Sequence, residues 1–127
     1  MAGNNLSRAK LTECVSFGRR AAREAIPEKG FDAAILDIPE PWEEVEAVGE
    51  ALRGSGVLVS LNPTFNQIEQ MAAALRKAGF IRIESCEILL RPILARDGKT
   101  RPVQRMVSHT EFLLFATKVA GEASRAT

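Results

Sequence analysis

The stretch "AAILDIPEPWEEV", residues 33–45, decides the fold class of this chain. It opens with four consecutive apolar residues, and such a run without polar alternation indicates a strand that is buried on both faces. Asp37 follows the run, and Pro41 suits the first turn of a helix, where its missing N–H would have no partner in any case. The stretch therefore predicts a strand over residues 33–38 that passes through a carboxylate and a stiff turn into an acidic helix.

The alternation of strand and helix continues along the chain. A second buried strand is expected over residues 57–61. The helix after it opens with a capping box, in which Thr64 is the N-cap and the side chain of Gln67 reaches back to it. Phe65 begins the apolar stripe that should bury this helix against the sheet.

Two further strands are expected over residues 80–90 and 111–118, and the loop between them contains no helix. Strands that alternate with helices predict right-handed crossovers and a largely parallel sheet. The last strand is reached without a helix, so we expect it to pair antiparallel. The pattern therefore predicts an α/β, Rossmann-like sheet, mostly parallel with an antiparallel last strand, and with helices on both faces.

The domain is predicted to span residues 13–118, between flexible segments at 1–12 and 119–127. Before the first buried strand we expect a weak strand over 13–17 and a basic helical stretch over 19–26. A chain of 127 residues that is 46% hydrophobic can bury one modest core. No apolar run approaches the roughly 20 residues that a membrane span needs. These features predict a soluble, cytoplasmic protein.

The two cysteines, Cys14 and Cys86, are far apart and show no metal-binding spacing. We expect two buried thiols in a reducing compartment. The chain has one histidine, so these residues cannot complete a tetrahedral zinc shell, and no metal is predicted.

The formal net charge of +1 conceals two oppositely charged regions. Residues 31–54 carry seven acidic residues against one arginine, whereas residues 91–105 carry five basic residues against one aspartate. A basic loop of this kind can bind phosphates, although it is more often a solvated surface. The candidates for phosphate binding are Arg91, Arg96, Lys99, Arg101 and Arg105.

Polar residues mark the ends of both buried strands. Ligands of open α/β sheets bind outside the carboxyl ends of the strands, so Asp37 and Asn62 could face one crevice. Asp37 could equally cap a strand-to-helix turn, and Trp42 could pack in the core instead of stacking on a base. Capping already accounts for Gln67, and His109 could simply bond nearby backbone.

Three motifs in this order resemble one known family: an Asp-x-Pro-x-Pro-Trp strand end, a Pro-Thr-x-Asn-Gln helix start, and Arg-Pro followed by Met and His-Thr-x-Phe-Leu. They occur in "DAAILDIPEPWE", "GVLVSLNPTFNQIEQMAAALRKAGF" and "RPVQRMVSHTEFLLFATK", and the resemblance covers roughly residues 13–118. The chain resembles the carboxyl-terminal half of the tRNA (adenine-N1)-methyltransferases that modify the T-loop adenine. The resemblance implies a class I methyltransferase fold, S-adenosylmethionine (SAM) as methyl donor, tRNA as substrate and a tetrameric assembly.

The resemblance also implies roles for individual residues. Asp37 matches the active-site aspartate. Attack by the lone pair of adenine N1 leaves positive charge on the ring, and a fixed carboxylate that accepts from the exocyclic amino group would stabilise that charge. The residues expected near the target adenine, with Asn62 added from its place at a strand end, are Pro39, Trp42, Asn62, Asn66, Gln67, His109 and Thr110.

One family feature is missing from the sequence. A SAM site needs a glycine-rich turn that leads from strand into helix, whereas the clustered glycines Gly54 and Gly56 lead from helix into strand. The chain is therefore expected to be inactive alone and to need a homo-oligomer or a complementary SAM-binding chain. The alternative is a non-catalytic tRNA-binding or assembly module derived from the family. No membrane partner is expected.

Overall fold

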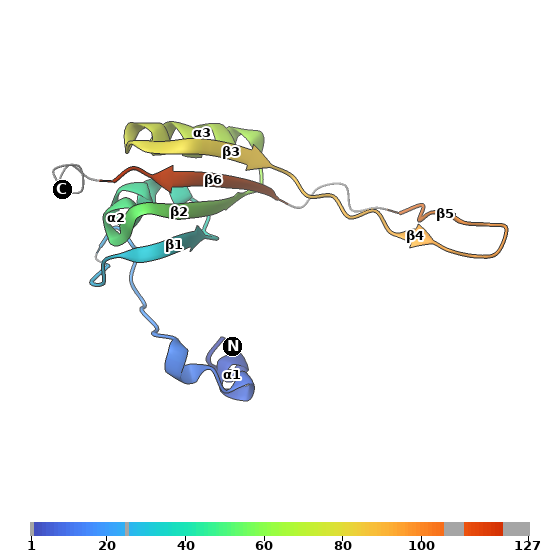
Figure 1. Cartoon of the computed structure of the whole chain (residues 1–127), viewed down its shortest axis with the longest axis horizontal. Coiled ribbons are helices and arrows are strands. Elements are labelled where there is room, and N and C mark those ends of the chain that lie inside the picture. Colours follow the sequence, from blue (N-terminus) through green and yellow to red (C-terminus); the bar gives the residue numbers. More distant parts are fainter. Residues whose placement is uncertain (1, 25, 106–110, 121–127) are drawn as a thin grey trace.

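The structure is a computed structural model, and it describes residues 2–24, 26–105 and 111–120. Its centre is a four-stranded sheet with the strand order β1-β2-β6-β3 (Figure 1). The strands of this sheet are β1 (Phe31–Leu36), β2 (Leu52–Asn62), β3 (Phe80–Cys86) and β6 (Phe112–Lys118).

The strand directions confirm the predicted mixed sheet. β1 pairs with β2 in parallel, with Ala33 opposite Val57 and Leu36 opposite Ser60. β6 lies between β2 and β3 and is antiparallel to both. β1, β2 and β3 therefore run in one direction, and the last strand alone is reversed.

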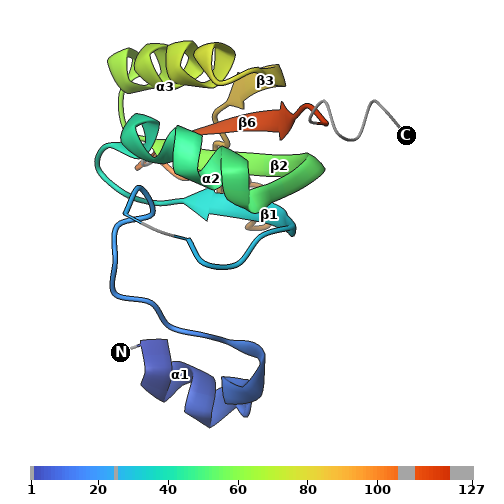
Figure 2. The ribbon, with the colours of Figure 1, turned by 90° about the vertical axis from the view of Figure 1, so that its left-hand side faces the viewer.

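The crossover segments lie on one face of the sheet. The first consists of the short 3-10 helix η2 (Pro41–Glu44) and α2 (Val45–Ala51), and the second is α3 (Phe65–Lys77), which packs against η2. Figure 2 shows α2 in front of β2, and α3 lies next to β3. Their apolar side chains share one core with the sheet, made of Leu36, Val45, Val48, Leu52, Leu58, Met71, Ala72, Leu75, Phe80, Leu114 and Ala116.

Helices were expected on both faces of the sheet, but the described crossover helices all lie on one face. Two right-handed crossovers that advance in the same direction along a sheet must place their helices on the same side. As a result, β1 is not buried on both faces as its apolar run indicated: Ile35 is 72% exposed, whereas Leu36 is 8% exposed. The same open face carries Val57 and Phe115, which are 37% and 36% exposed.

The second crossover helix begins as the sequence predicts. The side-chain oxygen of Thr64 accepts from the backbone N–H of Gln67, and the Gln67 side chain accepts from the backbone N–H of Thr64, so the capping box is confirmed. The first crossover helix ends at Ala51, because the backbone becomes extended at the buried Leu52. An added Cβ at Gly56 would lie 2.9 Å from the carbonyl oxygen of Arg53, so this bend in early β2 requires glycine.

The amino-terminal segment differs most from expectation. Residues 2–9 form α1 (Ala2–Ala9), and Thr12–Cys14 form a short 3-10 helix where a strand was expected. The basic stretch over 19–26 contains only a turn in its described part. Figures 1 and 2 show α1 far from the sheet. Within the described residues no strand from this segment pairs with β1, so β1 is an edge strand that pairs with β2.

Beyond β3 the chain leaves the sheet as a long projecting arm (Figure 1). A small hairpin, β4 (Ile93–Leu94) with β5 (Arg101–Pro102), forms its distal part. The strand expected over 80–90 ends at Cys86, the last residue to pair with β6. Cys14 and Cys86 are both free and exposed, so the expected burial of the thiols is wrong.

In the part of the chain that the structure describes, no helix has both the length and the apolar character to cross a bilayer.

Candidate functional site

Several of the predicted site residues lie at the carboxyl-end rim, which is the edge of the sheet where β1, β2 and β3 end and β6 begins. Leu36 is level with Ser60 in the β1–β2 register. Asp37 and Asn62, one and two residues further on, therefore reach the same rim, as the parallel pairing predicts. Asp37 is exposed there, so its carboxylate is available to a ligand.

Asn62 lies beneath the rim instead of on its surface. It alternates with Leu58 and Ser60 on the core face of β2, and all three residues have an exposed fraction of 0%. Its Nδ2 donates to Ser60 Oγ at 2.8 Å and to the Ser60 carbonyl oxygen at 3.3 Å. Its Oδ1 is buried and has no hydrogen-bond partner among the residues that the structure describes. The structure therefore places Asn62 in the core, with no open face toward a shared crevice.

The turn after Asp37 is anchored at its far end by two apolar residues. Pro39 is exposed in the turn, whereas Pro41 is fully buried at the start of η2. Trp42 is half-buried and packs against the core, as expected if its role is packing and not stacking on a base. It also lines a cavity of about 970 Å³ between α2 and α3. The turn therefore connects two fixed points, the end of β1 and the buried start of η2.

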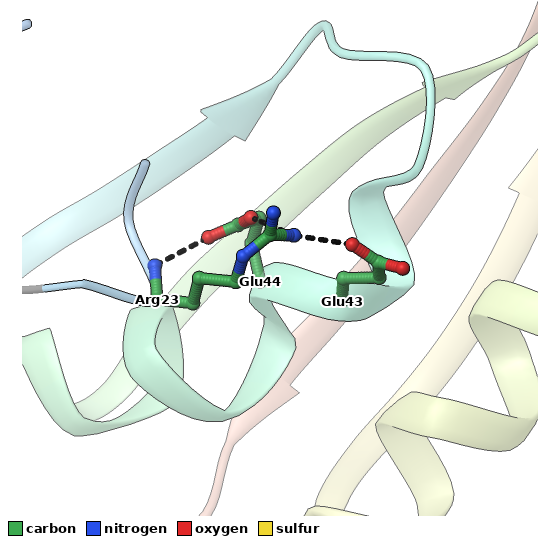
Figure 3. Close-up of polar contacts among 3 residues, drawn as sticks. All are labelled: Arg23, Glu43 and Glu44. Carbon is green, nitrogen blue, oxygen red and sulfur yellow. Dashed lines mark hydrogen bonds and ion pairs between the residues drawn. The ribbon is translucent and has the colours of Figure 1, made fainter. Parts of the chain in front are cut away.

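A charged clamp, which we define as Arg23 with Glu43 and Glu44, holds the start of that helix (Figure 3). Glu44 is 5% exposed, and its carboxylate accepts from the backbone N–H and the guanidinium of Arg23. The guanidinium also pairs with Glu43. A carboxylate this buried needs such partners. This clamp was not predicted from the sequence. The sequence feature that could have indicated it is the basic stretch over 19–26, which has the opposite charge to the acidic helix start near residue 43.

At the start of α3 the predicted residues divide between two positions. Gln67 is engaged in the capping box, with its Oε1 accepting from the Thr64 backbone N–H at 3.1 Å and from the Thr64 hydroxyl at 3.0 Å. Asn66 is exposed beside it. The structure therefore brings Asn66 to the surface near the rim, and it fixes Gln67 as a cap.

An aromatic pair at the same end of the sheet was missed. Phe65, expected in the core, is 71% exposed and stacks on Phe112, with ring centroids 4.7 Å apart and ring planes inclined by 18°. The two rings border a cavity of about 460 Å³ between α3 and the adjoining ends of β3 and β6. The helical spacing placed Phe65 in the apolar stripe. It gave no indication that the first turn of α3 lies at the rim, where this side chain is exposed.

The five cations proposed for phosphate binding all lie on the projecting arm and are exposed: Arg91, Arg96, Lys99, Arg101 and Arg105. The arm also exposes four large aliphatic side chains, Ile88, Leu89, Leu90 and Ile93, at 54–81%. A segment that exposes this much apolar surface next to cations has the character of a contact surface. The predicted residues His109 and Thr110 lie outside the described residues.

The described turns of the rim lack the glycines that a SAM-binding turn needs. The two strand-to-helix turns of the rim, residues 37–40 and 63–64, contain no glycine. Gly54 and Gly56 lie within β2, where close packing by Ala120 and Arg53 accounts for them. Over the same residues, no group of three or more His, Cys, Asp and Glu side chains could hold a metal ion.

A family model described as "tRNA methyltransferase complex GCD14 subunit" matches residues 4–100 of the chain. Among curated proteins, a tRNA (adenine(57)-N(1)/adenine(58)-N(1))-methyltransferase of Methanocaldococcus jannaschii is 36% identical over 95 residues, which are 74% of this chain and 34% of the relative.

Solved structures agree with this match. A Thermotoga maritima protein described as a SAM-dependent O-methyltransferase superposes with a TM-score of 0.89 at 40% identity and covers 95% of this chain and 46% of its own. The tRNA (m1A58) methyltransferase of Aquifex aeolicus superposes with a TM-score of 0.84 at 31% identity, over 94% of this chain and 49% of its own. The chain thus spans less than half of each of these three proteins. With a family model matched over most of its length and its rim built on a class I methyltransferase sheet, this chain belongs to the GCD14 family of tRNA methyltransferases.

Proposed function

We propose that this chain forms the target-adenine side of a SAM-dependent tRNA (adenine-N1)-methyltransferase, with Asp37 as its catalytic carboxylate. The observation that carries the proposal is the position of Asp37: it is exposed at the carboxyl-end rim, directly after β1, in a turn fixed by the buried Pro41. Three relatives whose printed names include methylation of tRNA or SAM-dependent methyl transfer support the class of reaction.

The chemistry assigned to Asp37 concerns the adenine alone. N1 carries its own lone pair, so Asp37 need not remove a proton before attack. The ring gains positive charge as N1 is alkylated, and a carboxylate that accepts from the exocyclic amino group stabilises that charge. The clamp on η2 and the prolines of the turn reduce the ordering that remains to be done in the transition state.

The projecting arm is proposed to bind the tRNA backbone. Its five cations lie on an extended segment with a single aspartate among them, and such a surface attracts phosphates. The exposed aliphatic residues at the base of the arm are proposed to contact a second polypeptide, either another copy of this chain or a complementary subunit.

The SAM side is proposed to come from residues outside the described part of the chain, in the same or in another polypeptide. The rim turns do not fit the cofactor, and β1 leaves a free strand edge next to an open apolar face. Free edges and faces of this kind are covered in most native proteins. We therefore propose that the described residues do not transfer methyl groups by themselves.

A second candidate function is a non-catalytic tRNA-binding or assembly module. The arm favours it, because its cations and aliphatic residues are presented independently of the rim. Under this function Asp37 only shapes a turn.

Reconstitution separates the two functions. The chain is combined with the amino-terminal half of the Aquifex aeolicus relative, and methyl transfer from radiolabelled SAM to unmodified tRNA is measured for the mixture and for each part. The enzyme function predicts transfer by the mixture alone. Tight tRNA binding without transfer by any combination would favour the non-catalytic module.

A further inference from the structure

The cavity beside the stacked phenylalanines lies on the same rim as Asp37 but at a different place. β6 is two positions from β1 in the sheet order, so the cavity lies about 10 Å along the rim from Asp37. Stacked bases are about 3.4 Å apart, and the distance therefore exceeds the thickness of one base. A base in this cavity is a different nucleotide from the one at Asp37.

The walls of the cavity suit a nucleobase better than a phosphate. Phe65 offers a ring face that is largely free of protein contact, since it is 71% exposed while its stacked partner Phe112 is half-buried. Ile68 supplies an apolar wall, and the described lining contains two carboxylates, Glu69 and Glu87, and no cation. The carboxylate of Glu69 repels phosphate, but it can accept a hydrogen bond from the exocyclic amino group of a base.

The volume and the surroundings agree with this occupant. About 460 Å³ is within the range of small-ligand sites. The chain continues from the cavity wall at Cys86 into the arm, whose first cation is Arg91, five residues on. An RNA strand with its base in the cavity would therefore keep its phosphates near the cations of the arm and away from the carboxylates.

We propose that this cavity is a base-stacking subsite, in which Phe65 extends the Phe65–Phe112 stack by one RNA nucleobase and Glu69 selects a base that carries an exocyclic amino group. The proposal rests on the proposed binding of tRNA and adds a second recognition point to it. Aromatic side chains that stack on single-stranded bases contribute substantially to affinity and tolerate different bases, whereas the carboxylate adds the preference.

The test is a binding cycle with fluorescently labelled strands at one low salt concentration. Phe65→Leu is expected to weaken binding of a short oligoadenylate about tenfold, because stacking is lost while the apolar contact remains. An abasic sugar-phosphate strand of the same length should bind the variant and the unaltered chain equally. Phe17→Leu, which removes a phenylalanine of similar exposure (64%) from the amino-terminal segment, is the control.

The outcomes separate this subsite from the proposed function. If Phe65→Leu left oligoadenylate binding unchanged while loss of the arm cations weakened it, the subsite alone would be overturned. An equal loss on the abasic strand would also overturn it, since a general structural effect would then explain the result. If the unaltered chain bound neither strand, both proposals would fall.

A second titration tests the proposed preference for a base that carries an exocyclic amino group. Oligouridylate is expected to bind several-fold more weakly than oligoadenylate, because uracil presents carbonyl oxygens to Glu69. Glu69→Gln should bring the two affinities together, since an amide can donate to those oxygens. Equal binding of both strands by the unaltered chain would overturn the role of Glu69.

Discussion

The rim and the arm of this molecule are built in opposite ways. The rim stands on a shared core: Leu58, Leu75 and Leu114 beneath it have exposed fractions of 0%. The arm leaves the sheet after Cys86 and exposes most of its large aliphatic side chains. The rim can therefore hold Asp37 in one geometry by intramolecular packing, whereas most of the large aliphatic side chains of the arm have no such packing.

The largest expected difference between the two regions is in folding stability. Leu114→Ala should lower the free energy of unfolding by about 2–5 kcal/mol, because it leaves a cavity in the core. Ile93→Ala on the arm, where the side chain is 56% exposed, should change it by less than about 0.5 kcal/mol. Urea unfolding followed by circular dichroism checks both, and similar losses would show that the arm is part of the cooperative core.

The arm should dominate instead in RNA binding. Replacing Arg96, Lys99 and Arg101 together by alanine removes three exposed cations from the hairpin region. The slope of log K against log salt for tRNA binding should become shallower by about 2 to 3, as expected for three lost phosphate contacts. Replacing Arg8, Arg19 and Arg20 in the amino-terminal segment is the matched control. An unchanged slope in the arm variant would remove the phosphate-binding role.

The clamp on η2 should have a smaller effect on stability. Arg23→Ala removes the guanidinium from the buried Glu44 but keeps the backbone N–H that also donates to it. The free energy of unfolding should fall by about 1–2 kcal/mol, since a charged group loses part of its hydrogen bonding. Arg20→Ala, in the same exposed segment, should be neutral in the same urea titration. Equal stability of the two variants would show that the clamp contributes nothing.

The smallest effect belongs to the helix cap. Thr64→Ala removes the side-chain acceptor for the Gln67 backbone N–H and should cost about 1 kcal/mol. Thr100 also bonds nearby backbone, at Arg96 on the arm, yet Thr100→Ala should leave global unfolding unchanged because the arm lies outside the core. A thermal melt distinguishes the two, and an equal loss in both variants would contradict the separation of rim and arm.

Local sequence patterns predicted the turns of the rim correctly, but they did not predict the burial of the residues next to those turns. The placement of Asp37 and the cap at Thr64 followed from the sequence, because strand ends and helix starts are specified by a few adjacent residues. The burial of Asn62 depends on which face of β2 meets the core, and the exposure of Phe65 depends on where α3 begins relative to β6. Both depend on tertiary packing, which a short pattern of residue types does not specify.

The prediction for the segment before β1 was wrong for a related reason. Residues 13–17 showed the composition of a weak strand, but a strand forms only with a partner, and the structure pairs β1 with β2 alone. The basic residues over 19–26 have the pattern of a helix, although one of them, Arg23, has its partners in η2. This pairing is a long-range contact, which local helical propensity does not specify.

The central claim, that the rim presents Asp37 to the target adenine, is tested most directly by methyl transfer in the reconstituted mixture of this chain with the amino-terminal half of its relative. Single-turnover rates are compared for the unaltered chain, Asp37→Asn, and the control Asp32→Asn, which changes an exposed carboxylate near the other end of β1. Asp37→Asn should slow transfer about 100-fold or more, the size expected when one charge-stabilising group is removed, with tRNA binding unchanged. A rate for Asp37→Asn equal to that of Asp32→Asn would contradict the account.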